Sequence, residues 1–180
     1  MFNHDSALTE TFAPIQHRVL VLGHGGHGKG TLCRMLYKEY GERSLSSSEA
    51  AWPYIWPAFN EATRRKYATP EIGYENRRQH RMLCKRLISL LNTPDKTTLS
   101  KLILSQVPIY DGMRDADEYA DSEHLFTLKI WVDAMGREGT FRDPSMQITC
   151  PREAIIVENN EGLPELAKKV QNLAKYFTTE

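Results

Sequence analysis

The sequence has little cysteine, no long apolar run and no net charge. Its three cysteines, Cys33, Cys84 and Cys150, lie far apart and form no CxxC pair, which argues against a disulfide framework and against a zinc site. No apolar run approaches the length of about 20 residues that crosses a bilayer. Residues 1–16 lack the basic start and apolar stretch of a secretory signal. We therefore expect a cytoplasmic protein.

What the sequence does contain is an ordinary globular composition. Of its 180 residues, 41% are apolar and 26% are charged, values typical of a chain that can bury one sizeable core. We expect one domain over residues 1–180, with residues 1–16 as a flexible arm.

The zero net charge hides an uneven distribution. Residues 60–101 carry ten basic side chains against four acidic ones, a balance of +6, whereas residues 102–180 carry eight against fourteen, a balance of −6. A basic middle segment favours an anionic partner, so we interpret residues 60–101 as a helical region that binds the acceptor. A solvated helix face would carry the same charges.

Strand-like and helix-like patterns alternate along the chain. The strands are expected at 17–22, 43–47, 107–110, 125–132 and 154–157, and the helices at 32–40, 74–91, 98–106, 115–123 and 163–177. The Trp-Pro pairs at 52–53 and 56–57 are expected to break the intervening segment into short pieces. Such alternation predicts an α/β fold, a parallel sheet of about five strands with helices on both faces. The strand ends should then meet at one cleft.

A glycine-rich loop follows the first strand and precedes the first helix. A pattern of the type G-x-x-x-x-G-K-[ST] exposes backbone N–H groups to phosphate oxygens, and the helix N-terminus adds partial positive charge. This predicts a three-layer P-loop NTPase fold and ATP as the donor. The predicted phosphate-binding residues are Gly23, His24, Gly25, Gly26, His27, Gly28, Lys29, Gly30 and Thr31.

Two features of that loop depart from the common pattern. Gly30 follows Lys29 directly and Thr31 comes one position later, a G-K-G-T ending typical of adenylate-kinase-type nucleotide kinases. His24 and His27 either donate to phosphate, contact the acceptor, or are tolerated side chains that face solvent, and the last interpretation is slightly favoured.

Several arginines are candidates for contact with the moving phosphoryl group, because the guanidinium fork suits phosphate oxygens. Arg77, Arg78 and Arg81 lie in the predicted basic helix, where Arg77, Arg81 and Lys85 would form one stripe. Arg114 comes just after a strand end, facing either the cleft or a helix surface. Residues 134–151 read as a lid loop that closes over ATP, with Arg137 as a catalytic candidate and Arg142 as an ATP contact.

Carboxylates at strand ends are candidates for the general base and for magnesium binding. Asp111 and Glu49 are both assigned to catalysis, and the sequence does not separate their roles. Asp111 with Thr31 is the predicted Mg²⁺ site, while Ser48 and Glu49 are expected to meet the acceptor. Asn160, in the turn after the last strand, is placed beside the adenine ring of ATP. Among Trp52, Tyr54, Trp56 and Phe59, at least two are expected in the core and the others are free to stack on a base.

Taken together, six segments resemble the bacteriophage P-loop kinases, which include deoxynucleoside monophosphate kinases and 5-hydroxymethyluracil DNA kinases. The segments are GHGGHGKGT (23–31), SSSE (46–49), YENRRQHR (74–81), IYDGMR (109–114), IWVD (130–133) and IIVENNEG (155–162). The likeness runs over roughly residues 17 to 176, and its IYDGMR (109–114) and RRQHR (77–81) elements point to the DNA-kinase branch.

This resemblance implies that ATP phosphorylates the 5-hydroxymethyl group of 5-hydroxymethyluracil in phage DNA, a step in thymidine hypermodification. A kinase for free deoxynucleoside monophosphates is the alternative, and a slow nucleotide-hydrolysing switch or a DNA-binding module without catalysis is disfavoured. Arg77, Arg81 and Arg114 would handle the acceptor or the transition state. The chain departs from the family pattern at Gly26, where an arginine is expected, and at Gly30, where an aspartate is expected. The missing aspartate shifts the role of base to Asp111 or Glu49.

Overall fold

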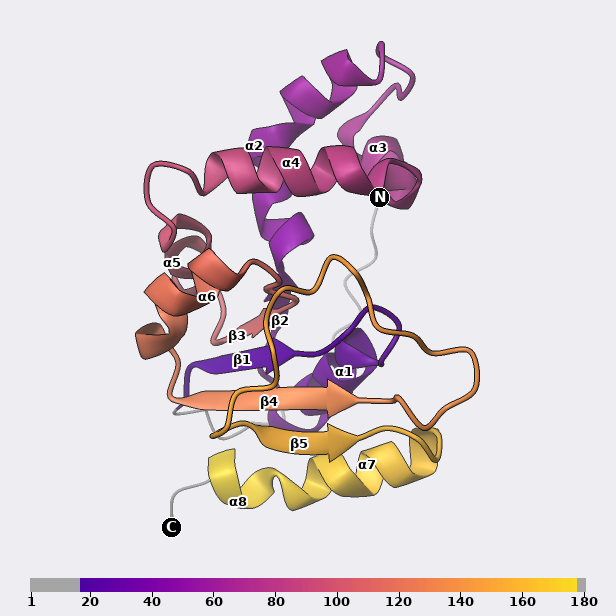
Figure 1. Cartoon of the computed structure of the whole chain (residues 1–180), viewed down its shortest axis with the longest axis vertical. Helices are drawn as coiled ribbons and strands as arrows, with labels where there is room; N and C mark the ends of the chain where they lie inside the picture. Colours follow the sequence, from indigo (N-terminus) through magenta and orange to yellow (C-terminus); the bar gives the residue numbers. More distant parts are fainter. Residues whose placement is uncertain (1–16, 178–180) are drawn as a thin grey trace, which may run out of the picture.

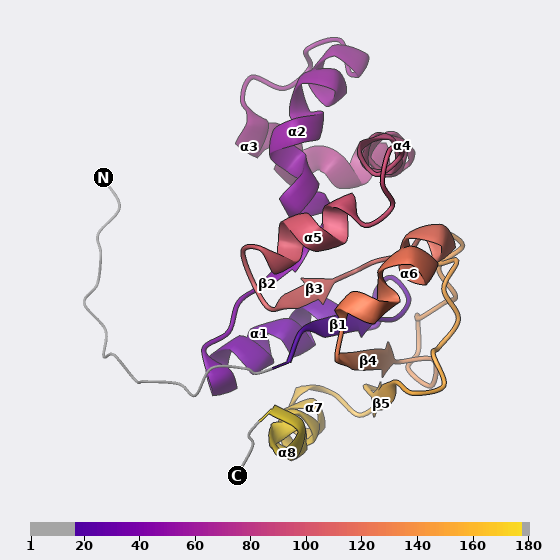
Figure 2. The same cartoon turned by 90° about the vertical axis from the view of Figure 1, so that its left-hand side faces the viewer.

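The computed structural model describes residues 17–177, in which five strands form one parallel sheet in the order β2-β3-β1-β4-β5. The strands are β1 (Val19–Leu22), β2 (Ser44–Ser46), β3 (Ile109–Asp111), β4 (Leu128–Asp133) and β5 (Ile155–Glu158). Helices cover both faces, as Figure 2 shows. The predicted α/β three-layer fold is therefore confirmed. The arm expected at residues 1–16 lies outside the described residues.

The central strand β1 explains why the sheet needs cover on both faces. All four of its side chains are fully buried, and successive strand side chains point to opposite faces. Val19 and Val21 pack with α1 (Lys29–Tyr40) and α7 (Leu163–Asn172). Leu20 and Leu22 belong to the opposite core, which α2 (Ser47–Ala62), α5 (Thr98–Leu104) and α6 (Ala116–Ser122) help to build.

A helical arm stands away from the sheet (Figure 1). It consists of the outer part of α2 together with α3 (Pro70–Asn76), the 3₁₀ helix η1 (Arg77–His80) and α4 (Arg81–Leu91). The arm packs on itself through α2, which contacts both α3 and α4. The predicted basic region 60–101 maps mostly onto this arm.

The helix starts and stops follow their local chemistry. Helix α1 ends at Gly41, whose left-handed conformation (φ 76°) lets its N–H bond to Tyr37 O at 2.7 Å. Helix α2 begins after Ser46, whose side chain accepts from the Glu49 N–H at 3.2 Å. The end of α1 at Tyr40 agrees with the helix expected at 32–40.

The two Trp-Pro pairs do not divide their segment into short pieces, so that prediction was wrong. Helix α2 runs unbroken through Pro53 and Pro57, both exposed. Each proline removes one backbone hydrogen bond, but the opposite face of the helix buries Trp52, Ile55 and Phe59. Burial of such side chains is worth roughly 1.5–3 kcal/mol each, enough to outweigh the lost bonds.

The prediction of a single long helix over 74–91 was also wrong. Helix α3 ends at Asn76, η1 turns the chain, and α4 starts at Arg81. The turn is held by His80, whose Nε2 lies 2.7 Å from the Tyr67 hydroxyl. Arg77 stacks on Tyr74, with its guanidinium carbon 3.6 Å from the ring centroid, so the predicted stripe of Arg77, Arg81 and Lys85 does not exist.

The C-terminal helix is likewise divided, into α7 and α8 (Ala174–Phe177). A turn at Leu173 lets Phe177 reach the ring of Tyr40, at a centroid distance of 5.2 Å. Residues 134–151 contain no helix or strand, as predicted. Within residues 17–177 no helix has the length and apolar character needed to cross a membrane.

Candidate active site

The glycine-rich loop joins β1 to α1 at the carboxyl edge of the sheet, as predicted. Two of its glycines are required by close contacts. A Cβ on Gly23 (φ +134°) would lie 2.4 Å from the Val132 carbonyl oxygen, and a Cβ on Gly28 (φ +98°) would lie 2.3 Å from Asn159 Nδ2. No other residue fits either position without a shift of the backbone or of the buried amide.

Lys29 lies inside this loop and is buried. Its Nζ donates to the carbonyl oxygens of Gly23 at 2.8 Å and His24 at 3.0 Å. Burial lowers the pKa of Lys29, while the nearby carboxylate of Asp111 opposes the shift. The ammonium group of Lys29 therefore lies on the inner side of the glycine-rich loop. In P-loops in general, the lysine contacts phosphates from this position.

Asp111 ends β3 beside this lysine. Its Oδ1 is buried and has no hydrogen-bond partner in the described part of the chain. Burial raises the pKa of Asp111, and the charges of Lys29 and Arg114 act against that rise. A buried carboxylate oxygen without a partner, close to the start of α1, suits a cation.

The residues present fit a magnesium ion. Mg²⁺ is usually held by one or two protein oxygens together with water and substrate phosphates. Asp111 and the hydroxyl of Thr31 are the candidate ligands, although Thr31 Oγ1 also accepts from Arg34 at 3.1 Å. Among residues 17–177 no cluster of three or more His, Cys, Asp or Glu side chains could hold a metal alone.

The two loop histidines do not face solvent, so the favoured interpretation of them was wrong. His27 is fully buried, and its Nδ1 accepts from the Ala134 N–H at 3.0 Å. His24 Nδ1 accepts from the Asp143 N–H at 3.2 Å. Burial lowers the pKa of His27. Both side chains therefore fasten the glycine-rich loop to the loop 134–151.

Asp143, which the sequence did not single out, is the centre of the site. Its side chain is 1% exposed, and its Oδ2 accepts from Arg81 at 2.5 Å, from Arg114 and from the Gly25 N–H at 3.2 Å. Burial works against ionisation, but bonds from Ser145 and the charge of Arg114 hold the pKa of Asp143 well below its usual range. The sequence around Asp143 indicates only a turn. In the structure that turn is formed by Asp143 Oδ1, which accepts from the Ser145 N–H at 3.0 Å.

Asp143 brings together residues that the sequence could only list separately. Arg81 comes from the first turn of α4, Arg114 from the segment after β3, and Gly25 from the glycine-rich loop. Arg114 therefore points to Asp143 and Ser145 of the loop 134–151. The loop 134–151 passes from the end of β4 across these elements to β5 (Figure 1).

The catalytic candidate Arg137 and the predicted ATP contact Arg142 lie in the loop 134–151, and the predicted ATP contact Asn160 follows β5. Arg137 donates to the Gly26 carbonyl oxygen at 2.7 Å, and Arg142 is exposed. Asn160 is exposed, and its Oδ1 accepts from the Gly136 N–H at 3.0 Å. The neighbouring Asn159 is the buried member of the pair and donates to the His27 carbonyl oxygen at 2.9 Å, a role that the sequence did not indicate.

The predicted acceptor residues are only partly brought together. Ser48 and Glu49 lie in the first turn of α2, one turn from the edge of the sheet. Arg81 points to Asp143, whereas Arg77 is stacked on Tyr74 and Arg78 is exposed.

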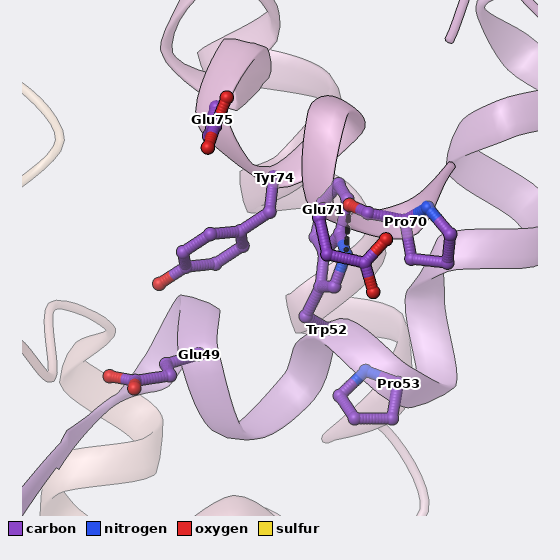
Figure 3. Close-up of a pocket in the computed structure, with 7 residues that line it drawn as sticks. All are labelled: Glu49, Trp52, Pro53, Pro70, Glu71, Tyr74 and Glu75. Carbon is purple, nitrogen blue, oxygen red and sulfur yellow. Dashed lines mark hydrogen bonds between the residues drawn. The ribbon is translucent and has the colours of Figure 1, made fainter. Parts of the chain in front are cut away.

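A cavity of about 280 Å³ opens between α2 and α3 beside Glu49 (Figure 3). Its aromatic walls are Trp52, which donates from Nε1 to the Pro70 carbonyl oxygen at 2.9 Å, and Tyr74. Three carboxylates also line it, from Glu49, Glu71 and Glu75, and no basic side chain does. Of the four aromatic candidates, Trp52 and Phe59 are buried and Tyr54 is exposed, so the expectation of at least two core residues is confirmed.

Comparison with known proteins supports the fold and nothing finer. No protein-family model matches the chain, and no curated protein sequence matches it. A solved structure, the TT1252 protein of Thermus thermophilus, is similar with a TM-score of 0.50 at 15% sequence identity. The match covers 89% of this chain and 97% of that chain. The likeness therefore extends over most of the three-layer architecture.

Proposed function

We propose that the chain is an ATP-dependent P-loop phosphotransferase. The observation that carries this proposal is the convergence of Arg81 and Arg114, from separate elements, on the mouth of a glycine loop that holds Lys29. Phosphoryl transfer needs positive charge around the moving group. A switch that only binds nucleotide has no need for two arginines from outside the loop.

Each residue of the site has a defined part in this proposal. Lys29 and the loop N–H groups hold the phosphates of ATP, and Arg114 and Arg81 stabilise the charge on the transferred group. Thr31 and Asp111 are the ligands for Mg²⁺, which would neutralise phosphate charge when bound. Asp111 lies against Lys29, whereas Glu49 lines the cavity; we therefore assign the metal to Asp111 and the general base to Glu49.

For the acceptor we propose 5-hydroxymethyluracil in DNA. The cavity beside Glu49 has aromatic walls and suits a planar base, while its carboxylates disfavour a phosphate inside it. The basic side chains of Arg64, Arg65 and Lys66 are exposed on the arm outside the cavity. A base taken out of the DNA stack would enter the cavity, and the DNA backbone would contact these outer charges.

A free deoxynucleoside monophosphate is the second candidate. The observation in its favour is that Arg81 and Arg114 bind a single carboxylate next to the loop, an arrangement that suits the one phosphate of a nucleoside monophosphate. The same cavity would then take its base.

An acceptor panel separates these candidates. The protein is incubated with γ-labelled ATP and Mg²⁺ and with duplex DNA containing 5-hydroxymethyluracil, single-stranded DNA of the same sequence, unmodified DNA, or each deoxynucleoside monophosphate. Label in the modified DNA alone is the expected result. Label in monophosphates alone would replace the first candidate by the second, and ATP binding without any transfer would contradict the phosphotransferase itself. Glu49→Gln should lower the transfer rate with little change in the KM for ATP, by about 10²-fold or more if Glu49 is the base.

The compartment proposed for this activity remains the cytoplasm. All three cysteines are free thiols in the described chain, and Cys33 and Cys84 are buried. Free thiols are typical of a reducing compartment.

A further inference from the structure

Three donors converge on one oxygen of Asp143. The Gly25 N–H comes from the phosphate loop, and the two guanidinium groups come from Arg81 and Arg114. The acceptor carboxylate is almost fully buried, while the side chains of Arg81 and Arg114 are 52% and 30% exposed. The site is thus a built anion pocket that the chain fills from its own loop 134–151.

The donors of this pocket are those that proteins use for phosphoryl oxygens. Glycine-loop N–H groups and guanidinium forks bind phosphate because they match its oxyanions in geometry and charge. The close approach depends on Gly25, since a Cβ there would lie 2.5 Å from Asp143 Oδ2. Lys29 is turned to the loop carbonyls and makes no hydrogen bond to Asp143 in the described structure.

We infer that the Asp143 carboxylate is an internal stand-in for a phosphoryl group, and that a phosphate of the ligand takes its place at Gly25, Arg81 and Arg114. That the ligand is a nucleotide rests on the function proposed above. The carboxylate cannot stay, because a second anion within hydrogen-bond distance of the same donors would repel the phosphate. Phosphate oxygens carry more charge than a carboxylate and therefore prevail at the two arginines.

Release of Asp143 is a local event in the fold. The loop that carries it has no helix or strand between residues 134 and 151. Asp143 is held by its bonds to the arginines and Gly25, by its own N–H bond to His24, and by Ser145, whose hydroxyl lies 2.6 Å from Asp143 Oδ1. Ligand binding at the pocket is thereby coupled to the position of the loop.

Pyrophosphate binding to the full chain, measured by calorimetry, tests the inference. Asp143→Asn should bind pyrophosphate about tenfold or more tightly than the wild type. In the wild type the Asp143 carboxylate occupies the same donors in most molecules and competes with the ligand, and the variant lacks that charge. Ser145→Ala removes a hydroxyl that bonds Asp143 and both arginines but leaves the charge of Asp143 in place, so it should show a smaller gain. Glu138→Gln removes an exposed charge from the same loop and should bind like the wild type.

A second readout follows the loop directly. Hydrogen exchange of the segment 140–146 should increase when pyrophosphate binds to the wild-type protein, because the Asp143 N–H loses His24. Equal or weaker pyrophosphate binding by both Asp143→Asn and Ser145→Ala would overturn the inference and make Asp143 a support for the arginines. If the wild type transfers phosphate but these variants gain nothing, the inference alone fails. If neither wild type nor variant binds pyrophosphate or ATP, the proposed function fails with it.

Discussion

At the scale of single residues, Glu118 shows how burial changes an acidic group away from the site. It lies in α6, is 5% exposed and accepts from the Tyr110 hydroxyl at 2.9 Å. Burial raises the pKa of Glu118 from 4.5 to about 7, although the bond from Tyr110 opposes the rise. The folded protein therefore binds a proton between these pH values that the unfolded chain does not.

This shift predicts a pH dependence with a defined sign. A raised pKa gives stability that is complete below pH ~4.5 and is lost as the pH rises to ~7. Glu118→Gln should remove that loss, so the unfolding free energy of the variant relative to the wild type should rise by up to about 3 kcal/mol between pH 5 and 8. Urea melts across this range measure it, with the exposed Asp121→Asn as control. A constant difference between Glu118→Gln and wild type would contradict the shift.

The measurement must be a difference because His27 acts in the opposite direction. Burial lowers the pKa of His27, so its contribution is present above the unfolded value of ~6.5 and is lost as the pH falls through the lower folded value. In the wild type the two effects on the unfolding free energy partly cancel. In Glu118→Gln only the effect of His27 remains, so the unfolding free energy of the variant should rise with pH.

At the scale of elements, the packing of α3 on α2 depends on one glycine. A Cβ on Gly73 would lie 2.3 Å from Trp56 Cζ3, with two further ring atoms at 3.1 Å. An indole ring cannot bend away as a flexible chain end would, so α3 itself must move.

Gly73→Ala should therefore lower the unfolding free energy by about 1–3 kcal/mol. Because α3 also forms one wall of the cavity, the variant should raise the KM for the acceptor and leave the KM for ATP nearly unchanged. Chemical denaturation and initial rates measure the two effects. The matched control is Ile72→Ala, which alters an exposed neighbour on the same helix. A stable Gly73→Ala protein with unchanged kinetics would contradict the close packing.

The elements also show how far the sequence could predict this fold. The strand–loop–helix unit at 19–40 was predictable, because an apolar run, a glycine loop and a helical repeat follow one another directly. Helix α2 was not, since its prolines argue locally for a break and only the burial of Trp52, Ile55 and Phe59 outweighs them. The break at η1 depends on the pair Tyr67–His80, 13 residues apart, which no local pattern indicates.

The candidate site divides in the same way. Lys29 and Asp111 were predictable because their positions follow from the loop and from the end of a parallel strand. Asp143 was not, because its role comes from contacts 29 and 62 residues away in the sequence, with Arg114 and Arg81. The pairing of His27 with Ala134, 107 residues away, is equally non-local.

At the scale of the whole molecule, charge is separated between the arm and the rest of the chain. Exposed Arg64, Arg65 and Lys66 lie at the turn after α2, away from the acidic cavity. If DNA is the acceptor, the triple variant Arg64→Asn, Arg65→Asn, Lys66→Gln should raise the KM for DNA. It should also reduce the slope of log affinity against log salt by about 2, since each lost phosphate contact contributes about 0.7 on single strands.

The control for this prediction uses basic residues on the opposite layer. Lys38 on α1 and Lys168 on α7 are exposed, and their replacement by Gln removes positive charge without touching the arm or the residues assigned to ATP and Mg²⁺. Fluorescence titration of labelled single-stranded DNA at several salt concentrations gives the slopes. Equal slopes for the arm variant and the wild type would remove the arm from any DNA interface.

Lys29 is the residue at which the proposed binding of the phosphate donor by the glycine-rich loop can be measured on its own. Transfer from γ-labelled ATP is measured for the wild type and for Lys29→Ala, with circular dichroism and a thermal melt on both. We predict that the wild type transfers label and that Lys29→Ala loses about 10²-fold or more of the rate. The thermal melt checks that the fold persists, because Lys29→Ala removes a buried charge but also its bonds to the carbonyl oxygens of Gly23 and His24. Undiminished transfer by a folded Lys29→Ala protein would contradict the account.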